Sequence, residues 1–197
     1  MRDAGRWLES GWRRGLAALA VMLAAASASA AGREVAGVTL PDTTVYAGKT
    51  LTLNGAGLRT RFMFKVYVIG LYLEHPSTDA AAILAADEMR RAELHLLRAL
   101  TADEIGSAIA TAFEQNAGAA MPRLQARLDR LKAMFPAVEK DEVVALTYVP
   151  GKGTVVTAKG ADVGSIEGKD FADVLFAVWI GSAPVDQTLK QALLGAR

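Results

Sequence analysis

Alternating hydrophobic and polar residues predict strands in the first part of the chain beyond residue 30. Residues 33–40 and 50–54 are expected to form two opening strands, the second alternating strictly. Residues 62–73 form a longer β-branched and aromatic run in which both alternating sets are largely apolar. Such a strand belongs in a sheet covered on both faces, or covered on one face by a ligand. Gly55 and Gly57 before it are interpreted as a turn, where glycine also permits positive φ or a close backbone approach.

Apolar residues at helical spacing predict helices in the middle and at the end of the chain. A short Ala-rich helix is expected over residues 77–89, and Thr101 with Glu104 forms a capping box that begins the next. A helix is expected to open at Pro122 and to pair with it. Two more are expected, from residue 169 to Gly181 and around residues 189–193.

Further strands lie between these helices. Residues 91–97 alternate, and residues 142–148 and 154–159 flank a glycine-bearing turn that is typical of a β-hairpin. Strands come first, helices cluster in the middle and at the end, and strands return as a hairpin. We therefore predict an α+β fold with a mainly antiparallel sheet.

The first thirty residues have the pattern of a secretory signal peptide. Four arginines fall within the first fourteen residues, residues 16–26 form an apolar run, and Ala28-Ser29-Ala30 offers the small-x-small pattern that precedes cleavage. A retained membrane anchor is the alternative, but it would need about twenty apolar residues. We expect a signal peptide over residues 1–30, one domain over residues 31–197, and a periplasmic or secreted protein without a membrane span.

Charge and composition narrow the possible partners and cofactors. Removing the first thirty residues changes the net charge from +1 to −1, which leaves no basic surplus for binding nucleic acid. The chain has no cysteine, and its two histidines are twenty residues apart, so neither a metal nor a thiolate site is expected. Gly55-Ala56-Gly57 and Gly151-Lys152-Gly153 lack the context of nucleotide-binding loops, so no cofactor is expected. The serines form no nucleophile elbow.

Arg59 is the main candidate for chemistry, because it enters an apolar run and keeps its charge at any physiological pH. One interpretation pairs it with a carboxylate of the same chain or leaves it at the edge of the sheet. The other places it in an apolar cleft, where it binds an anionic ligand head while the long strand and the last helices accept a tail. Tyr67 would then add a hydroxyl donor, unless it is an ordinary strand aromatic.

Several segments together resemble the chalcone isomerase-like family, most closely its bacterial secreted branch. They are Gly57-Leu58-Arg59, residues 65–74, Val178-Trp179-Ile180-Gly181, Pro184-Val185 and Leu189-Lys190, which occur in order over most of the chain. The resemblance implies an antiparallel sheet with helices packed mainly on one face and a ligand cleft between them. Its plant enzymes close a flavanone ring, using an arginine and several hydroxyl groups.

The resemblance also indicates that most catalytic donors are missing. Arg59 corresponds to the family's arginine and Tyr67 to a strand threonine, whereas Ile105 stands for a tyrosine, Ala112 for an asparagine and Val178 for a serine or threonine, with Trp179 beside it. Each such donor typically contributes a few kcal/mol to stabilising a developing charge. Their loss argues against efficient isomerisation.

A sister branch of the family binds fatty acids and resembles this chain in keeping an arginine together with a tyrosine. Arg59 and Tyr67 would be the carboxylate-binding pair, although the turn between Arg59 and Lys65 is shorter here than in those relatives. We therefore expect a non-catalytic module that binds a small amphipathic carboxylate such as a fatty acid. The alternatives are an intramolecular lyase or isomerase on another substrate, and a structural or partner-binding protein with a closed cleft.

Overall fold

A computed structural model describes residues 32–195 of the chain. The expected signal peptide, residues 1–30, lies outside the described residues. In the part that is described, no helix combines the length and the apolar character needed to cross a membrane.

A seven-stranded sheet forms the centre of the fold, and each of its strands pairs antiparallel with the next strand along the chain. This confirms the predicted α+β class with an antiparallel sheet. Its strands are β3 (Thr43–Tyr46), β4 (Lys49–Arg61), β5 (Phe64–Leu73), β6 (Arg90–Leu96), β7 (Val143–Val149), β8 (Gly153–Ala158) and β9 (Ala161–Ile166). A separate hairpin of β1 (Gly32–Val35) and β2 (Val38–Pro41) precedes it.

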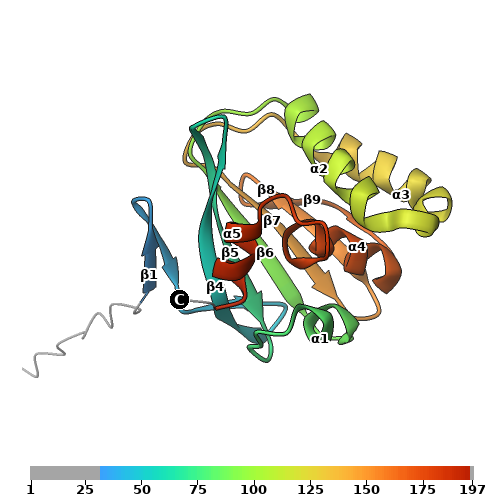
Figure 1. Ribbon diagram of the computed structural model, residues 1–197, viewed down its shortest axis with the longest axis horizontal. Helices are drawn as coiled ribbons and strands as arrows, with labels where there is room; N and C mark the ends of the chain where they lie inside the picture. The colour runs from blue at the N-terminus through green and yellow to red at the C-terminus, as the bar shows by residue number, and fades with distance from the viewer. Residues whose placement is uncertain (1–31, 196–197) are drawn as a thin grey trace, which may run out of the picture.

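The helices pack on one face of the sheet (Figure 1). They are α1 (Ala80–Ala85), α2 (Ala102–Ala117), α3 (Met121–Met134), α4 (Lys169–Ile180) and α5 (Gln187–Leu193), with a 3-10 turn over Gly118–Ala120 between α2 and α3. Their apolar stripes meet Ile69, Leu71 and Leu73 of β5 in the main core. The arrangement confirms the expected helix-covered sheet.

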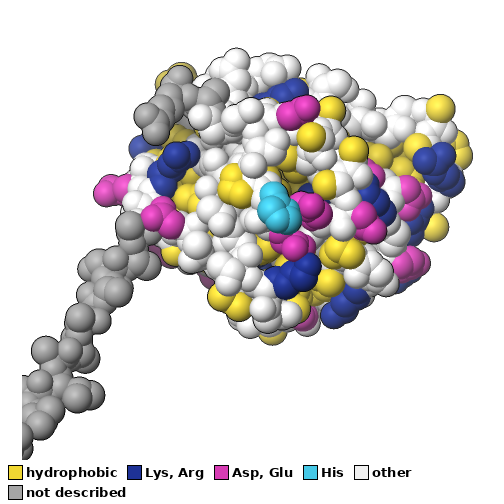
Figure 2. All heavy atoms as spheres, turned by 90° about the horizontal axis from the view of Figure 1, so that it is seen from below, with side chains coloured by type: hydrophobic (Ala, Val, Ile, Leu, Met, Phe, Trp, Pro, Cys, Tyr) yellow, Lys and Arg dark blue, Asp and Glu magenta, His cyan; other side chains and the backbone are white. Residues whose placement is uncertain are grey.

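The opposite face of β5 is covered by the N-terminal hairpin. Val68 packs with Leu40 and Ala56 in a second, smaller cluster, against which Val35 and Val38 lie. The long strand is thus apolar on both sides because both sides are covered, as its pattern predicted. Figure 2 shows one face of the molecule, where basic and acidic side chains are interspersed rather than gathered by sign.

The capping box of α2 is confirmed atom by atom. The hydroxyl of Thr101 accepts a hydrogen bond from the Glu104 backbone N–H at 3.1 Å, and the Glu104 carboxylate accepts one from the Thr101 N–H at 2.8 Å. Pro122 lies in the first turn of α3, and α2 packs beside α3 as a pair. The hairpin of β7 and β8 is also confirmed.

The interpretation of Gly55 and Gly57 as a turn was wrong, since both lie inside β4. The reason for glycine is the close approach of α5. A Cβ added to Gly55 would lie 2.2 Å from the carbonyl oxygen of Ala192, and one added to Gly57 would lie 2.6 Å from Cδ1 of Leu189. The second use of glycine that the sequence allowed, a close backbone approach, therefore applies.

Other boundaries also differ from the prediction. Residues 33–40 form a hairpin rather than one strand, because Ala36 and Gly37 turn the chain with φ of 50° and 86°. The strand expected from residue 62 begins at Phe64, and the strand β9 was not predicted. The short helix ends at Ala85 instead of near residue 89, where the chain leaves for β6.

A buried arginine, Arg90, donates hydrogen bonds to carbonyls at the C-terminal end of that short helix. The side chain of Arg90 is 2% exposed and pairs with Asp173. Its guanidinium carbon lies 4.8 Å and 5.0 Å from the ring centroids of Tyr148 and Phe176. One of its nitrogens donates to the carbonyl of Ile83 at 3.1 Å. Because a buried guanidinium is costly without partners, this set of contacts fixes α1 against α4.

Candidate functional site

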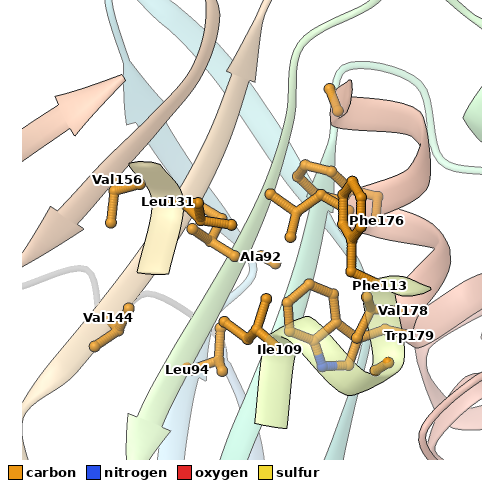
Figure 3. Close-up of a cluster of buried hydrophobic side chains, with 14 of the residues drawn as sticks. Ala92, Leu94, Ile109, Phe113, Leu131, Val144, Val156, Phe176, Val178 and Trp179 are labelled. Atoms are coloured by element: carbon orange, nitrogen blue, oxygen red, sulfur yellow. The ribbon is translucent and has the colours of Figure 1, made fainter. Parts of the chain in front are cut away.

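A cavity of about 710 Å³ lies between the sheet and α2. Apolar residues of the strands, among them Leu94 and Leu146, form one wall, and Ile109 of α2 faces them. Figure 3 shows Ile109 opposite Leu94, with the indole of Trp179 beside it. The rim along α2 is more polar, since Ser107 and other exposed residues of that helix line the opening.

All six residues that the sequence singled out line this cavity. Ile105 and Ala112 lie on the same face of α2 because they are seven residues, or about two turns, apart. Val178 and Trp179 come from the end of α4, and Arg59 and Tyr67 come from β4 and β5. Residues far apart in the chain thus meet at one cavity. Their contact with a ligand stays a prediction.

Arg59 borders both the cavity and a carboxylate of its own chain. Its Nη1 donates to Oδ2 of Asp186 at 3.2 Å and to the carbonyl of Thr60 at 2.9 Å. Its Nε and Nη2 make no hydrogen bond within residues 32–195. The first interpretation, pairing with a carboxylate of the same chain, is confirmed. Arg59 also lines the cavity, and its binding of an anionic ligand head stays a prediction.

Tyr67 lies directly opposite Arg59 in the register of β4 and β5. Its hydroxyl accepts a hydrogen bond from Nε1 of Trp179 at 3.0 Å, so its own proton remains to be donated. Burial raises the pKa of Tyr67 above its usual 10, although the hydrogen bond from Trp179 and the charge of Arg59 oppose the rise. The hydroxyl is consequently a donor at neutral pH.

Asp186 was not among the predicted site residues, although it follows Pro184-Val185 as a helix N-cap would. Its Oδ1 accepts the backbone N–H of Leu189 at 3.0 Å and so begins α5. The segment before it is held to α2 by Asn116, whose amide donates to the carbonyl of Ala183 at 2.8 Å. The N-cap role of Asp186 was readable in the sequence, whereas its pairing with Arg59, 127 residues away, was not.

Two more arginines stand at the opening of the cavity and were also not predicted. Arg61 follows Arg59 on β4, and Arg98 lies just before α2 and pairs with Glu104 at 3.4 Å. Val66 lines the cavity next to Tyr67 because the register of β4 and β5 shifts at this point. The lining thus carries three arginines together with Asp103 and Glu104, and Arg98 is paired with Glu104 as Arg59 is with Asp186.

Neither histidine lines the cavity, and each contacts a glutamate. His95 lies 3.1 Å from Glu93, which Arg91 also contacts at 3.0 Å. Burial by itself would raise the pKa of Glu93, but the hydrogen bond from His95 and the charge of Arg91 hold it below its usual value. Within residues 32–195, histidine and acidic side chains form no group of three or more that could hold a metal ion.

The chalcone isomerase-like family matches residues 32–195, which is most of the chain. The chain belongs to the chalcone isomerase-like family. A comparison with curated proteins found no match.

Among solved structures, this chalcone isomerase-like chain is similar to a fatty-acid binding protein of Arabidopsis thaliana. The two superpose with a TM-score of 0.64 over 80% of this chain and 92% of that one, at 17% sequence identity. At this identity the likeness shows a shared fold, an antiparallel sheet with helices on one side. What binds in the chalcone isomerase-like cavity has to be argued from its own residues.

In this chalcone isomerase-like cavity, two donors lie next to each other across β4 and β5. Ile105, Ala112 and Val178 make the wall apolar where the resemblance predicted lost hydroxyl and amide donors. Arg59 and Tyr67 supply a cation and a hydroxyl donor beside it. The arrangement can hold one anionic group and bury an apolar body next to it.

Proposed function

We propose that this protein binds a small amphipathic carboxylate, such as a fatty acid, in the cavity between the sheet and α2. The observation that carries the proposal is the position of Arg59 and Tyr67 directly opposite each other on the wall of an otherwise largely apolar cavity. We also propose that the protein belongs to the bacterial secreted branch and acts in the periplasm or outside the cell, because residues 1–30 have the pattern of a signal peptide.

The head group would bind between the two donors. Nε and Nη2 of Arg59 form the fork that matches the two oxygens of a carboxylate. The hydroxyl of Tyr67 supplies a third donor, and Trp179 holds it in place by donating to its oxygen. This geometry favours a carboxylate over a neutral polar group because two of the three donors are charged.

The tail would lie along the apolar wall. Cavities that bind small ligands typically enclose about 300–1,000 Å³, and 710 Å³ lies inside that range. Leu94, Leu146 and Phe135 line it, and each is nearly or fully buried from solvent. Transfer of an alkyl chain from water to such a wall contributes about 0.8 kcal/mol per buried methylene. The affinity is therefore expected to rise with chain length until the cavity is filled.

Asp186 sets a limit on this affinity. The ligand carboxylate must share Arg59 with Asp186, whose charge repels it. A fully paired Arg59 that serves only to fix α5 is the competing explanation, and it corresponds to a structural or partner-binding protein. The two explanations differ in what happens when Arg59 is removed.

Native mass spectrometry and ligand displacement test the proposal. The protein is purified without added lipid, its bound species are identified, and a fluorescent fatty acid is then displaced by dodecanoate and by dodecanol. Arg59→Ala should weaken dodecanoate at least tenfold and leave dodecanol unchanged, whereas Arg130→Ala, a surface arginine paired with Glu167 away from the cavity, should change neither. Equal affinities of the wild type and Arg59→Ala for dodecanoate would overturn the proposal.

A lyase or isomerase activity is the second candidate, favoured by one observation. Tyr67 stays protonated beside Arg59, and such a pair can also stabilise an oxyanion. An absorbance assay with chalcones decides between the two candidates. Turnover that is lost in both Arg59→Ala and Tyr67→Phe would favour the enzyme, and absence of turnover with tight dodecanoate binding would favour the binding module.

A further inference from the structure

The turn between β4 and β5 exposes three consecutive large apolar side chains. Phe62 is 81% exposed, Met63 98% and Phe64 70%. Figure 1 shows this hairpin end projecting on the same side of the molecule as the beginning of α2. An apolar cluster held out in water at the end of a hairpin is costly unless something covers it.

The backbone of this turn is strained in a way that the other turns are not. Four hairpins in the described residues are joined by two residues that both have positive φ. In the other three turns the second residue is glycine, at positions 37, 48 and 160. The turn at Phe62 and Met63 has φ of 47° and 68° with a large side chain at both places. A turn selected only for folding would carry asparagine and glycine here. Strain of this kind is often retained at functional positions.

The charged residues next to the tip along the chain have one sign. Arg61 and Lys65 flank the three apolar residues, and no acidic residue occurs from residue 59 to residue 73. The guanidinium of Arg61 lies 5.3 Å from the ring centroid of Phe62, so cation and ring are presented together. Apolar side chains with flanking cations match the layering of a bilayer surface, with acyl chains beneath anionic phosphates.

We propose that this hairpin tip, residues 61–65, docks the protein onto anionic phospholipid membranes. Phe62, Met63 and Phe64 enter the boundary between head groups and acyl chains, and Arg61 and Lys65 contact phosphates. A lipid surface fits better than a protein partner, because three side chains at a turn cover far less than the roughly 800 Å² per partner of a stable protein interface.

Docking would bring the cavity to the bilayer. Arg61 lines the mouth of the cavity and is two residues from Arg59 on the same strand. A carboxylate lipid could then pass between membrane and cavity without crossing bulk water. This exchange step rests on the proposed function, whereas the docking itself does not.

Vesicle flotation tests the docking. The protein is mixed with vesicles of phosphatidylcholine, with or without phosphatidylglycerol. The tip variant replaces Phe62 by Asn, Met63 by Gly and Phe64 by Thr, so it keeps a favourable turn and folds. The control variant, Val45→Thr with Val163→Thr, removes apolar side chains exposed elsewhere. All proteins share one N-terminus, verified by mass, so differences between them come from the substitutions.

We expect the wild type and the control to float with phosphatidylglycerol vesicles, and the tip variant to bind them at least tenfold more weakly. Arg61→Gln with Lys65→Gln should weaken binding about fivefold per charge, and added salt should reduce that difference. Equal flotation of wild type and tip variant, or no flotation of the wild type, would overturn the docking. Self-association of the wild type that the tip variant loses, without flotation, would assign the tip to a second copy instead.

The membrane docking and the proposed ligand binding can be disproved independently of each other. The tip variant should still bind dodecanoate in solution, because its substituted residues do not line the cavity. Arg59→Ala should still float with the vesicles. Loss of both properties in either variant would contradict the separation of the two surfaces.

Discussion

Replacing Asp186 with asparagine removes the negative charge beside Arg59 and keeps the shape of the side chain. The ion pair with Arg59 has a distance of 3.2 Å, and its partners are 22% and 24% exposed, so it contributes about 0.2–1 kcal/mol. Asparagine caps helices as well as aspartate does, so the hydrogen bond to Leu189 should survive. Asp186→Asn should therefore cost less than about 1 kcal/mol of unfolding free energy. Asp186→Ala, which also loses the cap, should cost about 1–3 kcal/mol.

The effect on binding should have the opposite sign. A ligand carboxylate on the open side of the Arg59 guanidinium would lie roughly 5–6 Å from Asp186, where the repulsion is about 0.8 kcal/mol at the dielectric of water and about 3 kcal/mol at an effective dielectric of about 20. Removing that repulsion should tighten dodecanoate binding by at least about fourfold. Dodecanol carries no charge, and its affinity should not change.

The assay is displacement of a fluorescent fatty acid at low and high salt, with urea unfolding run on the same samples. A gain for dodecanoate alone, at nearly unchanged stability, would support Arg59 as the carboxylate site. If Asp186→Asn binds dodecanoate no more tightly than the wild type, or gains equally for the alcohol, Arg59 does not hold the ligand's charge.

The strained turn makes a second prediction: Phe62→Asn with Met63→Gly should raise the melting temperature by about 2–8 °C, from about 1–2 kcal/mol of relieved strain. A fall measured by calorimetry would show that the turn is not strained. Gly55→Ala should lower the free energy of unfolding by about 1–3 kcal/mol, and Gly57→Ala should lower it less, because the first meets backbone of α5 and the second a side chain that can turn. Equal losses in urea would contradict this reading. The lowered pKa of Glu93 contributes stability above its usual value of 4.5, and this stability is lost as the pH falls through the folded-state value. The difference in unfolding free energy between the wild type and Glu93→Gln should therefore shrink as the pH falls from about 6 to about 3. If that difference stays constant, the charge of Glu93 does not contribute to stability.

Local patterns predicted the elements whose residues decide their own conformation. The capping box at Thr101, the apolar stripes of α3 and α4, and the alternation of β6 all appear in the structure. Each depends on neighbours within one or two turns or on the next strand. The strand β9 escaped prediction because Asp162, Gly164 and Ser165 give it little β character, and it is held at the sheet edge by pairing with β8.

The site was predictable only in part, for the same reason. Resemblance to a family placed Ile105, Ala112 and Val178 at the cavity, since they keep the family's order along the chain. Pairing across the fold left no local trace, so the contact of Arg59 with Asp186 was not foreseen. Gly55 was wrongly assigned to a turn because both a turn and the close approach of α5 require glycine, and the sequence does not distinguish them.

The packing of α5 on β4 also has a consequence for how the protein folds. The amide of Asn54 donates to the carbonyl of Leu193 at 2.8 Å, across 139 residues of chain, and to that of Ser77 at 2.9 Å. A growing chain therefore lacks these contacts, and the ion pair of Arg59 with Asp186, until its last helix has emerged and docked. Contacts of such long range form slowly. A ligand that binds only the finished cavity would stabilise only fully assembled molecules, so occupancy would report that folding is complete.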